Sequence, residues 1–164
     1  MKGDFTIRNS IQCDDGRLEE IIGLSFPRFF RFFASRSLNS EGPVLVGETG
    51  GRVVGFAKLI EFDVGGNRFG CVLWLAVHSD FRRRNIATWL VEVGTDYLLR
   101  HGAGAVFAST QRGNSGSLAT FRKAGFRRIG FMGLSRIFGW QVFSLYRDIW
   151  YAPGEILLMC EKAK

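Results

Sequence analysis

The second half of the chain alternates apolar runs with amphipathic stretches, and this order restricts the fold more than any other feature of the sequence. The apolar runs predict strands, and the stretches between them repeat their apolar residues at helical spacing. The predicted order is strand, helix, strand, helix and strand, over residues 69–78, 85–100, 105–109, 115–124 and 126–137. Strands joined through a helix run parallel, because the crossover returns the chain to the same end of the sheet. Part of the sheet is therefore predicted to be parallel.

The first half of the chain predicts a strand, two helices and two further strands, over residues 4–11, 14–24, 26–33, 44–46 and 53–62. Gly50 and Gly51 are expected to form a hairpin turn, and a final strand is expected over residues 155–160. No linker divides the chain, so we expect a single domain over residues 1–164. The predicted fold class is α/β (α+β), with a mixed, partly parallel central sheet of six to seven strands flanked by about four helices.

Composition argues against several classes of protein. The hydrophobic fraction of 46% is too high for a disordered chain. The apolar runs are far shorter than the roughly 20 residues that span a bilayer, and the first residues lack an apolar stretch of signal-peptide type. The three cysteines lie far apart without Cys-x-x-Cys spacing, which argues against a disulfide scaffold or a metal site. We therefore expect a cytoplasmic protein with no membrane partner.

The positive charge is concentrated in one part of the chain. The net charge is +7, and the segment 82–136 alone holds ten basic residues against two acidic ones. Seventeen of the 22 basic residues are arginines, whose side chains bind phosphate and carboxylate oxygens in pairs. Such a segment fits nucleic acid, an acidic membrane surface or a small polyanionic ligand, and charge alone does not choose among them.

An apolar strand that runs directly into a basic turn and a helix is the clearest local signal of a binding site. The sequence is Leu75-Ala76-Val77-His78-Ser79-Asp80-Phe81-Arg82-Arg83-Arg84-Asn85-Ile86-Ala87-Thr88. Three consecutive arginines at a helix N-terminus oppose the helix dipole, at about 0.3–1 kcal/mol each. A bound anion reverses that sign, because backbone N–H groups and arginines converge on it. The segment is thus either a solvated basic turn or a phosphate-binding loop.

Two blocks of this sequence resemble the GNAT superfamily of N-acetyltransferases. Arg82-x-x-Asn85-x-Ala87 is similar to the family's acyl-CoA pyrophosphate loop, Gln/Arg-x-x-Gly-x-Gly/Ala, with Asn in place of the first Gly. Asn tolerates a positive φ better than most residues, so a glycine-like backbone is expected there. Asn114-x-x-Ser117-x-x-x-Phe121-x-x-x-Gly125-Phe126 is similar to the family's Asn-x-x-Ala…Tyr-x-x-x-Gly-Phe segment at the same spacing.

The resemblance implies an activity and a set of site residues. It implies an N-acetyltransferase that moves an acetyl group from acetyl-CoA to a primary amine of a small molecule or peptide, by direct attack in a ternary complex. The backbone N–H of Val77 is then the expected donor to the thioester oxygen. The residues expected to contact the cosubstrate are Leu75, Ala76, Val77, Arg82, Arg83, Arg84, Asn85, Ile86, Ala87, Thr88, Asn114, Ser117 and Phe121.

The sequence departs from the family at the two positions that move protons. Phe121 stands where the family has a tyrosine general acid, and phenylalanine cannot donate a proton. Val72 aligns with a position where the family often has a glutamate base. The candidate bases are His78, beside the oxyanion strand, and Glu61 or Asp63, at the end of the preceding strand, acting through water.

Substitutes for the missing acid are also present in the sequence. Ser117 could hold a water one turn before Phe121, and Tyr146 and Tyr151 are more distant candidates. An acid is not indispensable, since a departing thiol has a pKa near about 8.5.

Other functions remain open on the sequence alone. An acyl-CoA-binding domain of the same fold, without transferase activity, is favoured by Phe121. A nucleic-acid binder is disfavoured, because the basic cluster has no regular interleaving of aromatic residues. The Phe-rich segment 26–33 is interpreted as core, as the lid of an acceptor pocket, or as a membrane-surface helix. A homodimer agrees with the resemblance, although no feature specifies an interface.

Overall fold

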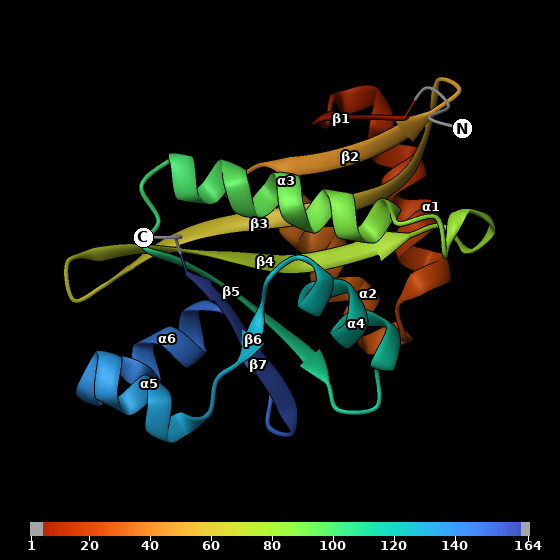
Figure 1. The fold of residues 1–164 in the computed structure, drawn as a ribbon. Coiled ribbons are helices and arrows are strands. Elements are labelled where there is room, and N and C mark those ends of the chain that lie inside the picture. The colour runs from red at the N-terminus through yellow and green to blue at the C-terminus, as the bar shows by residue number, and fades with distance from the viewer. Residues whose placement is uncertain (1–4, 162–164) are drawn as a thin grey trace.

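The computed structural model describes residues 5–161, which form a mixed sheet of seven strands (Figure 1). In spatial order the strands are β1, β2, β3, β4, β5, β7 and β6. Neighbouring strands are antiparallel except β4 and β5, which are parallel, as the sequence predicted. Of the predicted first strand, only Asp4 lies outside the described residues. The strands are β1 (Phe5–Asn9), β2 (Val44–Thr49), β3 (Arg52–Val64), β4 (Asn67–Val77), β5 (Ala105–Gln111), β6 (Arg127–Arg128) and β7 (Glu155–Glu161).

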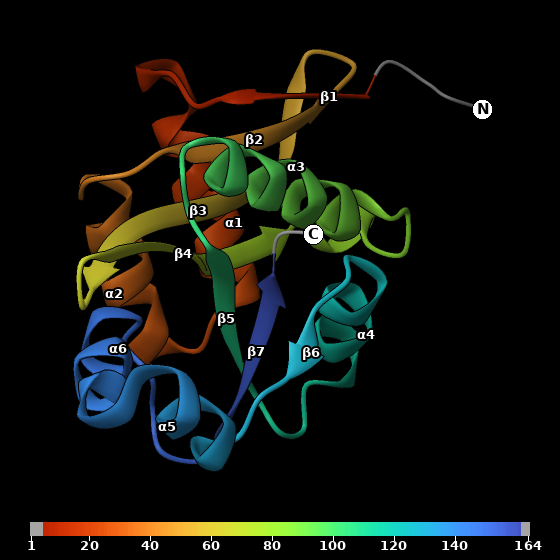
Figure 2. The same cartoon turned by 60° about the vertical axis from the view of Figure 1, so that its left-hand side comes forward.

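Helices cover both faces of the sheet (Figure 2). Helices α3 and α4 pack on one face, and α1, α2, α5 and α6 pack on the other. Along β5, Val106 and Ala108 face the first set while Ala105 and Phe107 face the second. No helix within residues 5–161 is both long and apolar enough to cross a bilayer. The helices of this part of the chain are α1 (Asp15–Ser25), α2 (Arg28–Leu38), α3 (Ile86–Arg100), α4 (Ser115–Lys123), α5 (Phe131–Phe138) and α6 (Val142–Asp148), with short 3-10 turns η1 (Gln12–Asp14), η2 (Ser79–Phe81) and η3 (Gly139–Gln141).

The prediction of a strand over residues 126–137 was wrong beyond residue 128, where helices α5 and α6 follow instead. β6 has two residues only, which pair with Met159 and Leu158 of β7. Beyond β6 the buried apolar residues recur every three or four positions, which is the period of a helix. They are Leu134, Phe138, Val142, Leu145 and Ile149. This stripe packs against the sheet and raises the number of α-helices above the expected four.

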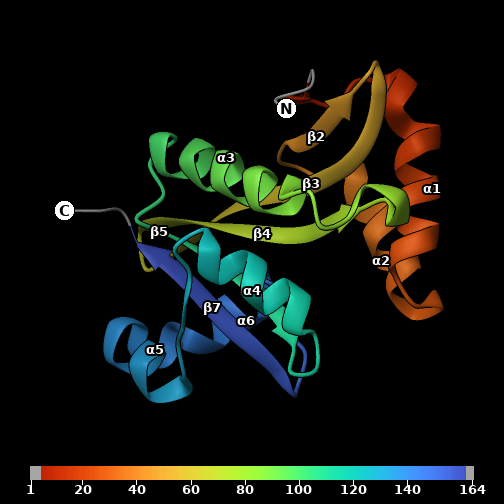
Figure 3. The same cartoon turned by 45° about the vertical axis from the view of Figure 1, so that its right-hand side comes forward.

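The parallel strands β4 and β5 pair briefly and then separate. Gly70 lies opposite Val106 and Cys71 opposite Phe107, and these are the pairs that join the two strands within the described chain. Figure 1 shows the strands diverging from this point. Figure 3 shows α3 beginning beside the end of β4, with α4 beside the gap between the strands. The divergence therefore opens the sheet next to the predicted binding loop.

A β-bulge in β4 accompanies the separation. Leu59 of β3 lies opposite Val72, but the preceding residue, Lys58, lies opposite Trp74. Leu73 is thus an extra residue on β4, and such bulges bend a strand and increase its twist. The bulge also reverses which side chains of β4 face α3, so that Trp74 faces α1 and α2.

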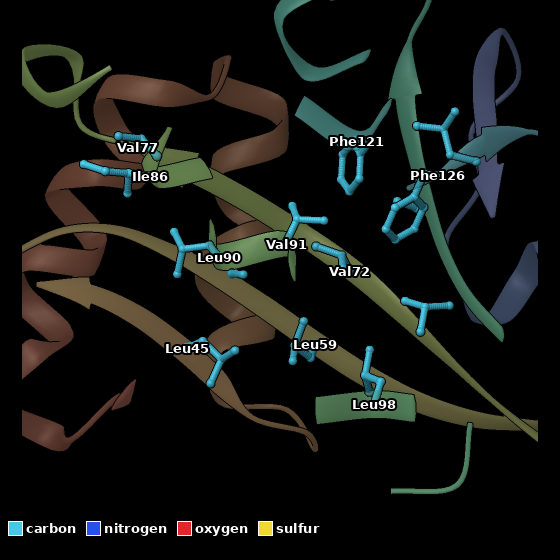
Figure 4. Packing of buried hydrophobic residues seen from close by; sticks show 14 of the residues in the cluster. Leu45, Leu59, Val72, Val77, Ile86, Leu90, Val91, Leu98, Phe121 and Phe126 are labelled. Atoms are coloured by element: carbon cyan, nitrogen blue, oxygen red, sulfur yellow. The ribbon is translucent and has the colours of Figure 1, made fainter. Parts of the chain in front are cut away.

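The largest hydrophobic cluster lies between the sheet and helices α3 and α4 (Figure 4). Gly55 of β3 permits close packing of α3, because a Cβ there would lie 2.9 Å from the carbonyl oxygen of Ala76 and 3.3 Å from Leu90 Cδ1. Figure 4 shows Phe121 and Phe126 side by side near Val72. Close packing at this face fixes the start of α3 relative to the end of β4.

A buried lysine holds the end of α2 against the sheet. The Lys58 ammonium donates to the carbonyl oxygens of Ser40, Glu41 and Gly42 at 2.9, 3.0 and 2.7 Å. The side chain is fully buried, and this burial lowers the pKa of the amino group. Because three carbonyl groups accept from one cation, the loop after α2 has a single position on β3.

The start of α1 is held to the first two strands by a buried carboxylate. Arg8 donates to both oxygens of Asp14, at 2.6 and 3.0 Å, and the N–H of Ile11 donates to the same carboxylate at 2.9 Å. Arg8 also contacts Glu48 of β2 at 2.7 Å. The bonds from Arg8, assisted by the Ile11 N–H, lower the pKa of Asp14.

We expect Asp14→Asn to lower the free energy of unfolding by about 1–2 kcal/mol at pH 7, because the charged hydrogen bonds are lost. Because the pKa of Asp14 is lower in the folded than in the unfolded protein, its carboxylate stabilises the native state at pH values above its ordinary pKa of about 3.9. This contribution is lost as the pH falls through the pKa of Asp14 in the native state. The difference between wild type and variant should therefore shrink below about pH 4. Urea unfolding across pH measures it. Asp96→Asn, in an exposed pair with Arg100, is the control and should change stability by less than about 0.5 kcal/mol.

Candidate functional site

The end of β4 presents backbone N–H groups that β3 does not use. The N–H of His78 donates to the carbonyl oxygen of Val54 at 2.8 Å, and bonded positions alternate along an antiparallel pair. Ala76 therefore also bonds toward β3, whereas the N–H groups of Leu75 and Val77 point toward β5. Because β5 has separated from β4, these two groups have no strand partner within residues 5–161. Each could donate to a carbonyl oxygen bound in the gap.

Arg82 occupies the carbonyl oxygen of Val77 at this edge of β4. Its Nε donates to the carbonyl oxygen of Val77 at 3.1 Å. The bond satisfies the one acceptor that Val77 turns toward the gap and leaves the N–H of Val77 open. It also ties the basic loop to the end of the strand.

The loop from η2 to α3 contains two residues in the left-handed region. Arg83 has φ 60° and Asn85 has φ 62°. Asn85 is the N-cap residue of α3, and its side chain makes no capping hydrogen bond. The Asn thus supplies the glycine-like backbone that the motif needs.

Six consecutive backbone N–H groups, those of residues 83–88, donate to no acceptor within the described part of the chain. The first helical bond of α3 runs from Trp89 to Asn85 at 3.0 Å, so the groups before it belong to the open end of the helix. Residues 83–85 are exposed. A run of unbonded N–H groups on a positively charged helix end is a binding site for phosphate oxygens.

The arginines of the loop add charge without carboxylate partners. Arg84 donates to the carbonyl oxygen of Asp80 at 3.3 Å and lies over the ring of Phe81 at 5.2 Å. Among the described residues, Arg82, Arg83 and Arg84 form no ion pair. Their charge is therefore available to an anion that binds at the loop.

The second sequence block begins with a capped helix and ends in the core. The Asn114 side chain accepts from the N–H of Ser117 at 3.0 Å and caps α4. Phe121 is 3% exposed, and its ring lies 5.1 Å from that of Phe126. Phe121 and Val72 therefore both pack in the hydrophobic cluster under α3 and α4. In this chain the position of the family's acid contributes to packing.

His78 is engaged in structural contacts. The N–H of Asp80 donates to Nδ1 of His78 at 3.3 Å, which caps η2. The proton of the neutral ring then lies on Nε2, which is 3.7 Å from a carboxylate oxygen of Glu20. His78 is buried, and the hydrogen bond at Nδ1 ties the ring to the turn η2 rather than to the edge of β4.

The structure does not bring Glu61 to the end of β4. Glu61 lies opposite Gly70, and Val77 is seven residues farther along the strand, a separation of roughly 23 Å. Its nearest cation is Arg68 at 3.7 Å, which also donates to the carbonyl oxygen of His101 after α3. Asp63 lies still nearer to the β3–β4 turn.

Tyr146 and Tyr151 line a separate cavity at the end of β5. The cavity has a volume of about 280 Å³ and is bordered also by Arg112, Arg128 and Glu155. The two tyrosine rings stack 4.7 Å apart, and the Tyr151 hydroxyl donates to the carbonyl oxygen of Glu155 at 2.8 Å. Burial raises the pKa of Tyr146. The Tyr151 hydroxyl is therefore bonded to the start of β7, and both tyrosines belong to this cavity rather than to the end of β4.

The sequence analysis missed Trp74 and the bulge at Leu73. Trp74 faces α2, with its ring 5.2 Å from Phe26 and 6.2 Å from Phe30, and its buried Nε1 finds no acceptor among the described residues. Its place on a strand beside the predicted oxyanion donor was the available signal. No sequence signal indicated the bulge, because neither glycine nor proline stands at or next to Leu73. Leu75 likewise offers an open N–H that the analysis assigned only to cosubstrate contact.

Comparison with known families places this fold and loop in context. Residues 12–126, well over half of the chain, match the acetyltransferase (GNAT) family. The chain therefore belongs to the GNAT acetyltransferase family. A comparison with curated protein sequences gives no significant match.

Solved structures with the same fold include three acetyltransferases. The Bacillus subtilis acetyltransferase in complex with CoA is 14% identical over 98% of this chain and 100% of its own, with a TM-score of 0.71. The ribosomal-protein-S18-alanine N-acetyltransferase of Escherichia coli is 17% identical over 98% and 95%, with a TM-score of 0.68. The ribosomal-protein-alanine N-acetyltransferase of Brucella melitensis is 20% identical over 96% and 99%, with a TM-score of 0.64. At these identities the likeness establishes the fold.

The left-handed backbone of Asn85 makes a testable demand on the residue at that position. We expect Asn85→Val to lower the free energy of unfolding by about 1–2 kcal/mol relative to Asn85→Gly, because a β-branched side chain clashes at positive φ. Urea unfolding of both variants measures the difference. Arg84→Val, at a neighbouring position with negative φ, is the control and should change stability by less than about 0.5 kcal/mol. Equal stability of the Val and Gly variants at residue 85 would contradict the left-handed conformation.

Proposed function

We propose that the protein transfers an acetyl group from acetyl-CoA to a primary amine of a small molecule or peptide, by direct attack in a ternary complex. The observation that carries the proposal is the run of six unbonded N–H groups at residues 83–88, beside the open N–H groups of β4. Membership of the GNAT family and the CoA bound to the Bacillus subtilis neighbour support it. The proposed acceptor class is supported by the alanine N-acetyltransferases among the neighbours.

The loop would hold the diphosphate of the cosubstrate. The N–H groups of residues 83–88 donate to phosphate oxygens, and Arg83 and Arg84 supply positive charge. Helix α4, whose start carries Asn114 and Ser117, lies beside the same opening of the sheet (Figure 3). The gap between β4 and β5 leaves room for an extended chain that bonds to the unused edge of β4, as an added strand would.

Acetyl-CoA, when bound, would supply the activated thioester. Val77 or Leu75 then donates its backbone N–H to the thioester oxygen, where negative charge develops as the amine attacks. One such donor is worth about 10²–10³ in rate. The donors are part of a strand and need no rearrangement, so they would act without a catalytic side chain.

The acceptor amine is proposed to approach from the face of the sheet covered by α1 and α2. Trp74 faces this side next to Leu75, and Phe26 and Phe30 pack on its ring. The buried Nε1 of Trp74 would donate to a polar group of the acceptor or to a water that orients it.

Because His78 and Glu61 are engaged elsewhere, we propose that the amine enters in its neutral form and loses its second proton to water after attack. The thiolate can leave unprotonated near neutral pH, since its conjugate acid has a pKa near about 8.5. An acyl-CoA-binding domain without transfer is the alternative that the buried Phe121 would favour.

Binding of coenzyme A tests the loop directly. We expect calorimetry to show binding that weakens by about tenfold or more in Arg83→Gln/Arg84→Gln and falls with rising salt, because two charged phosphate contacts are lost. Arg100→Gln, at the exposed end of α3, is the matched control and should bind like wild type. Absence of heat with millimolar coenzyme A would falsify the proposed site.

The pH dependence of acetyl transfer tests the proposed route of the proton. With acetyl-CoA and primary amines of different pKa, we expect kcat/KM to rise tenfold per pH unit up to the pKa of each amine, because only the neutral amine attacks. Thiol release measures the rate. His78→Gln and Glu61→Gln should keep the same profile. If the profile of kcat/KM against pH instead has the same inflection for every amine, and one variant abolishes it, the mutated residue is the base. If coenzyme A binds but no amine causes thiol release, the alternative function is supported.

A further inference from the structure

Two helical segments expose large apolar side chains on the face of the sheet opposite α3. On α2, Phe29 is 70% exposed and Phe32 is 64% exposed. On the segment from α5 to α6, Trp140 is 88% exposed and Met132 is 71% exposed, and Phe131 and Phe143 are at least half exposed. We call these six residues the aromatic face. Soluble proteins seldom expose so many large apolar side chains together without a partner.

The two parts of the aromatic face are joined through ring contacts. On the α5–α6 part, Phe143 lies 6.3 Å from Phe131 and 6.5 Å from Trp140. Where the two parts meet, the ring of Phe33 on α2 lies 6.0 Å from that of Trp150, which follows α6. Figure 2 shows α2, α6 and α5 along one side of the molecule. The exposed residues thus border a continuous helical surface.

Positive charge predominates on this surface. Helix α2 carries Arg28, Arg31 and Arg36 and has no acidic residue, and α5 carries Arg136. Two carboxylates lie at this surface: Asp148, the last residue of α6, is bonded to Arg147 at 2.9 Å, and Glu19 of α1 accepts from the Ser35 hydroxyl of α2 at 2.6 Å. The arginines of α2 and α5 form no ion pair within residues 5–161.

We propose that the aromatic face binds the surface of an anionic lipid bilayer. Tryptophan and phenylalanine side chains favour the boundary between headgroups and acyl chains, and arginines beside them bind lipid phosphates. Surface binding needs no spanning segment, so it is compatible with the lengths of α2 and α5. This inference does not depend on the proposed acetyl transfer.

A second copy of the chain fits this surface less well. In a two-fold symmetric contact each patch meets its own copy, so a surface on which arginines outnumber carboxylates would face another of the same sign. An anionic bilayer supplies a phosphate for each arginine and an apolar layer for the rings. Charge complementarity therefore selects the lipid surface.

Flotation with lipid vesicles tests the proposal on the full chain. Vesicles of neutral phosphatidylcholine are compared with vesicles containing anionic phosphatidylglycerol, at low and high salt. We expect at least tenfold stronger binding to the anionic vesicles. Met132→Ser/Trp140→Ser should weaken it at least tenfold, and Arg28→Gln/Arg31→Gln/Arg36→Gln should abolish the preference for anionic lipid. Val93→Ser, a half-exposed apolar position on α3, is the control and should bind like wild type.

Quenching by brominated lipid identifies the residue that enters the bilayer. We expect the quenching to fall in Trp140→Phe and in Trp150→Phe, since both tryptophans are exposed on this surface, and to be kept in Trp89→Phe, because Trp89 lies on α3 at the other face of the sheet. Melting temperatures of all variants establish that they are folded. Equal binding to neutral and anionic vesicles, no binding to either, or a dimer in sedimentation that Met132→Ser/Trp140→Ser disrupts would each overturn the proposal.

Discussion

The separation of β4 from β5 is the constraint on which the rest of the site depends. Two strands that stayed paired would satisfy each other's backbone groups and leave no donors at the carboxyl end of β4. Here the parallel ladder ends at Cys71 and Phe107, and the extra residue Leu73 turns β4 away. The open N–H groups of Leu75 and Val77 follow from this. The site is thus a consequence of an interrupted sheet rather than of a reactive side chain.

The loop after β4 and the start of α3 likewise contain backbone N–H groups without an acceptor in the described chain. Left-handed conformations at two non-glycine residues, Arg83 and Asn85, cost roughly 1–3 kcal/mol each. The strand behind them and the packed start of α3 hold them in place, and Arg82 fastens the loop through its bond to Val77. Strained conformations of this kind persist where the surrounding structure holds them in place. Here they accompany the six N–H groups of residues 83–88 that have no acceptor in the described chain.

The sequence predicted the order of strands and helices up to residue 128 because local signals agree there. Gly50 and Gly51 mark the hairpin, and Gly125 closes α4 at positive φ. The helices after β6 were missed although Leu134, Phe138 and Val142 repeat at helical spacing. The strand that begins at residue 126 was predicted to continue to residue 137, which covered most of α5. The bulge at Leu73 and the place of Glu61 depend on register between strands, which no local pattern encodes. For the same reason the sequence predicted a role for Val77 but none for Trp74, whose direction depends on the bulge.

The burial of Phe121 connects the core to the chemistry. A tyrosine at this position would bring its hydroxyl into the cluster with Val72 and Phe126, where a polar group without a partner costs about 1–3 kcal/mol. Phenylalanine completes that cluster instead, next to the gap between β4 and β5. It has no hydroxyl and therefore cannot act as the acid. In the proposed reaction, transfer would rest on backbone donors, on the low basicity of a departing thiolate, and on an acceptor that arrives neutral. Under that proposal the acceptor would be selected by the basicity of its amine as well as by its shape, because only the neutral amine attacks.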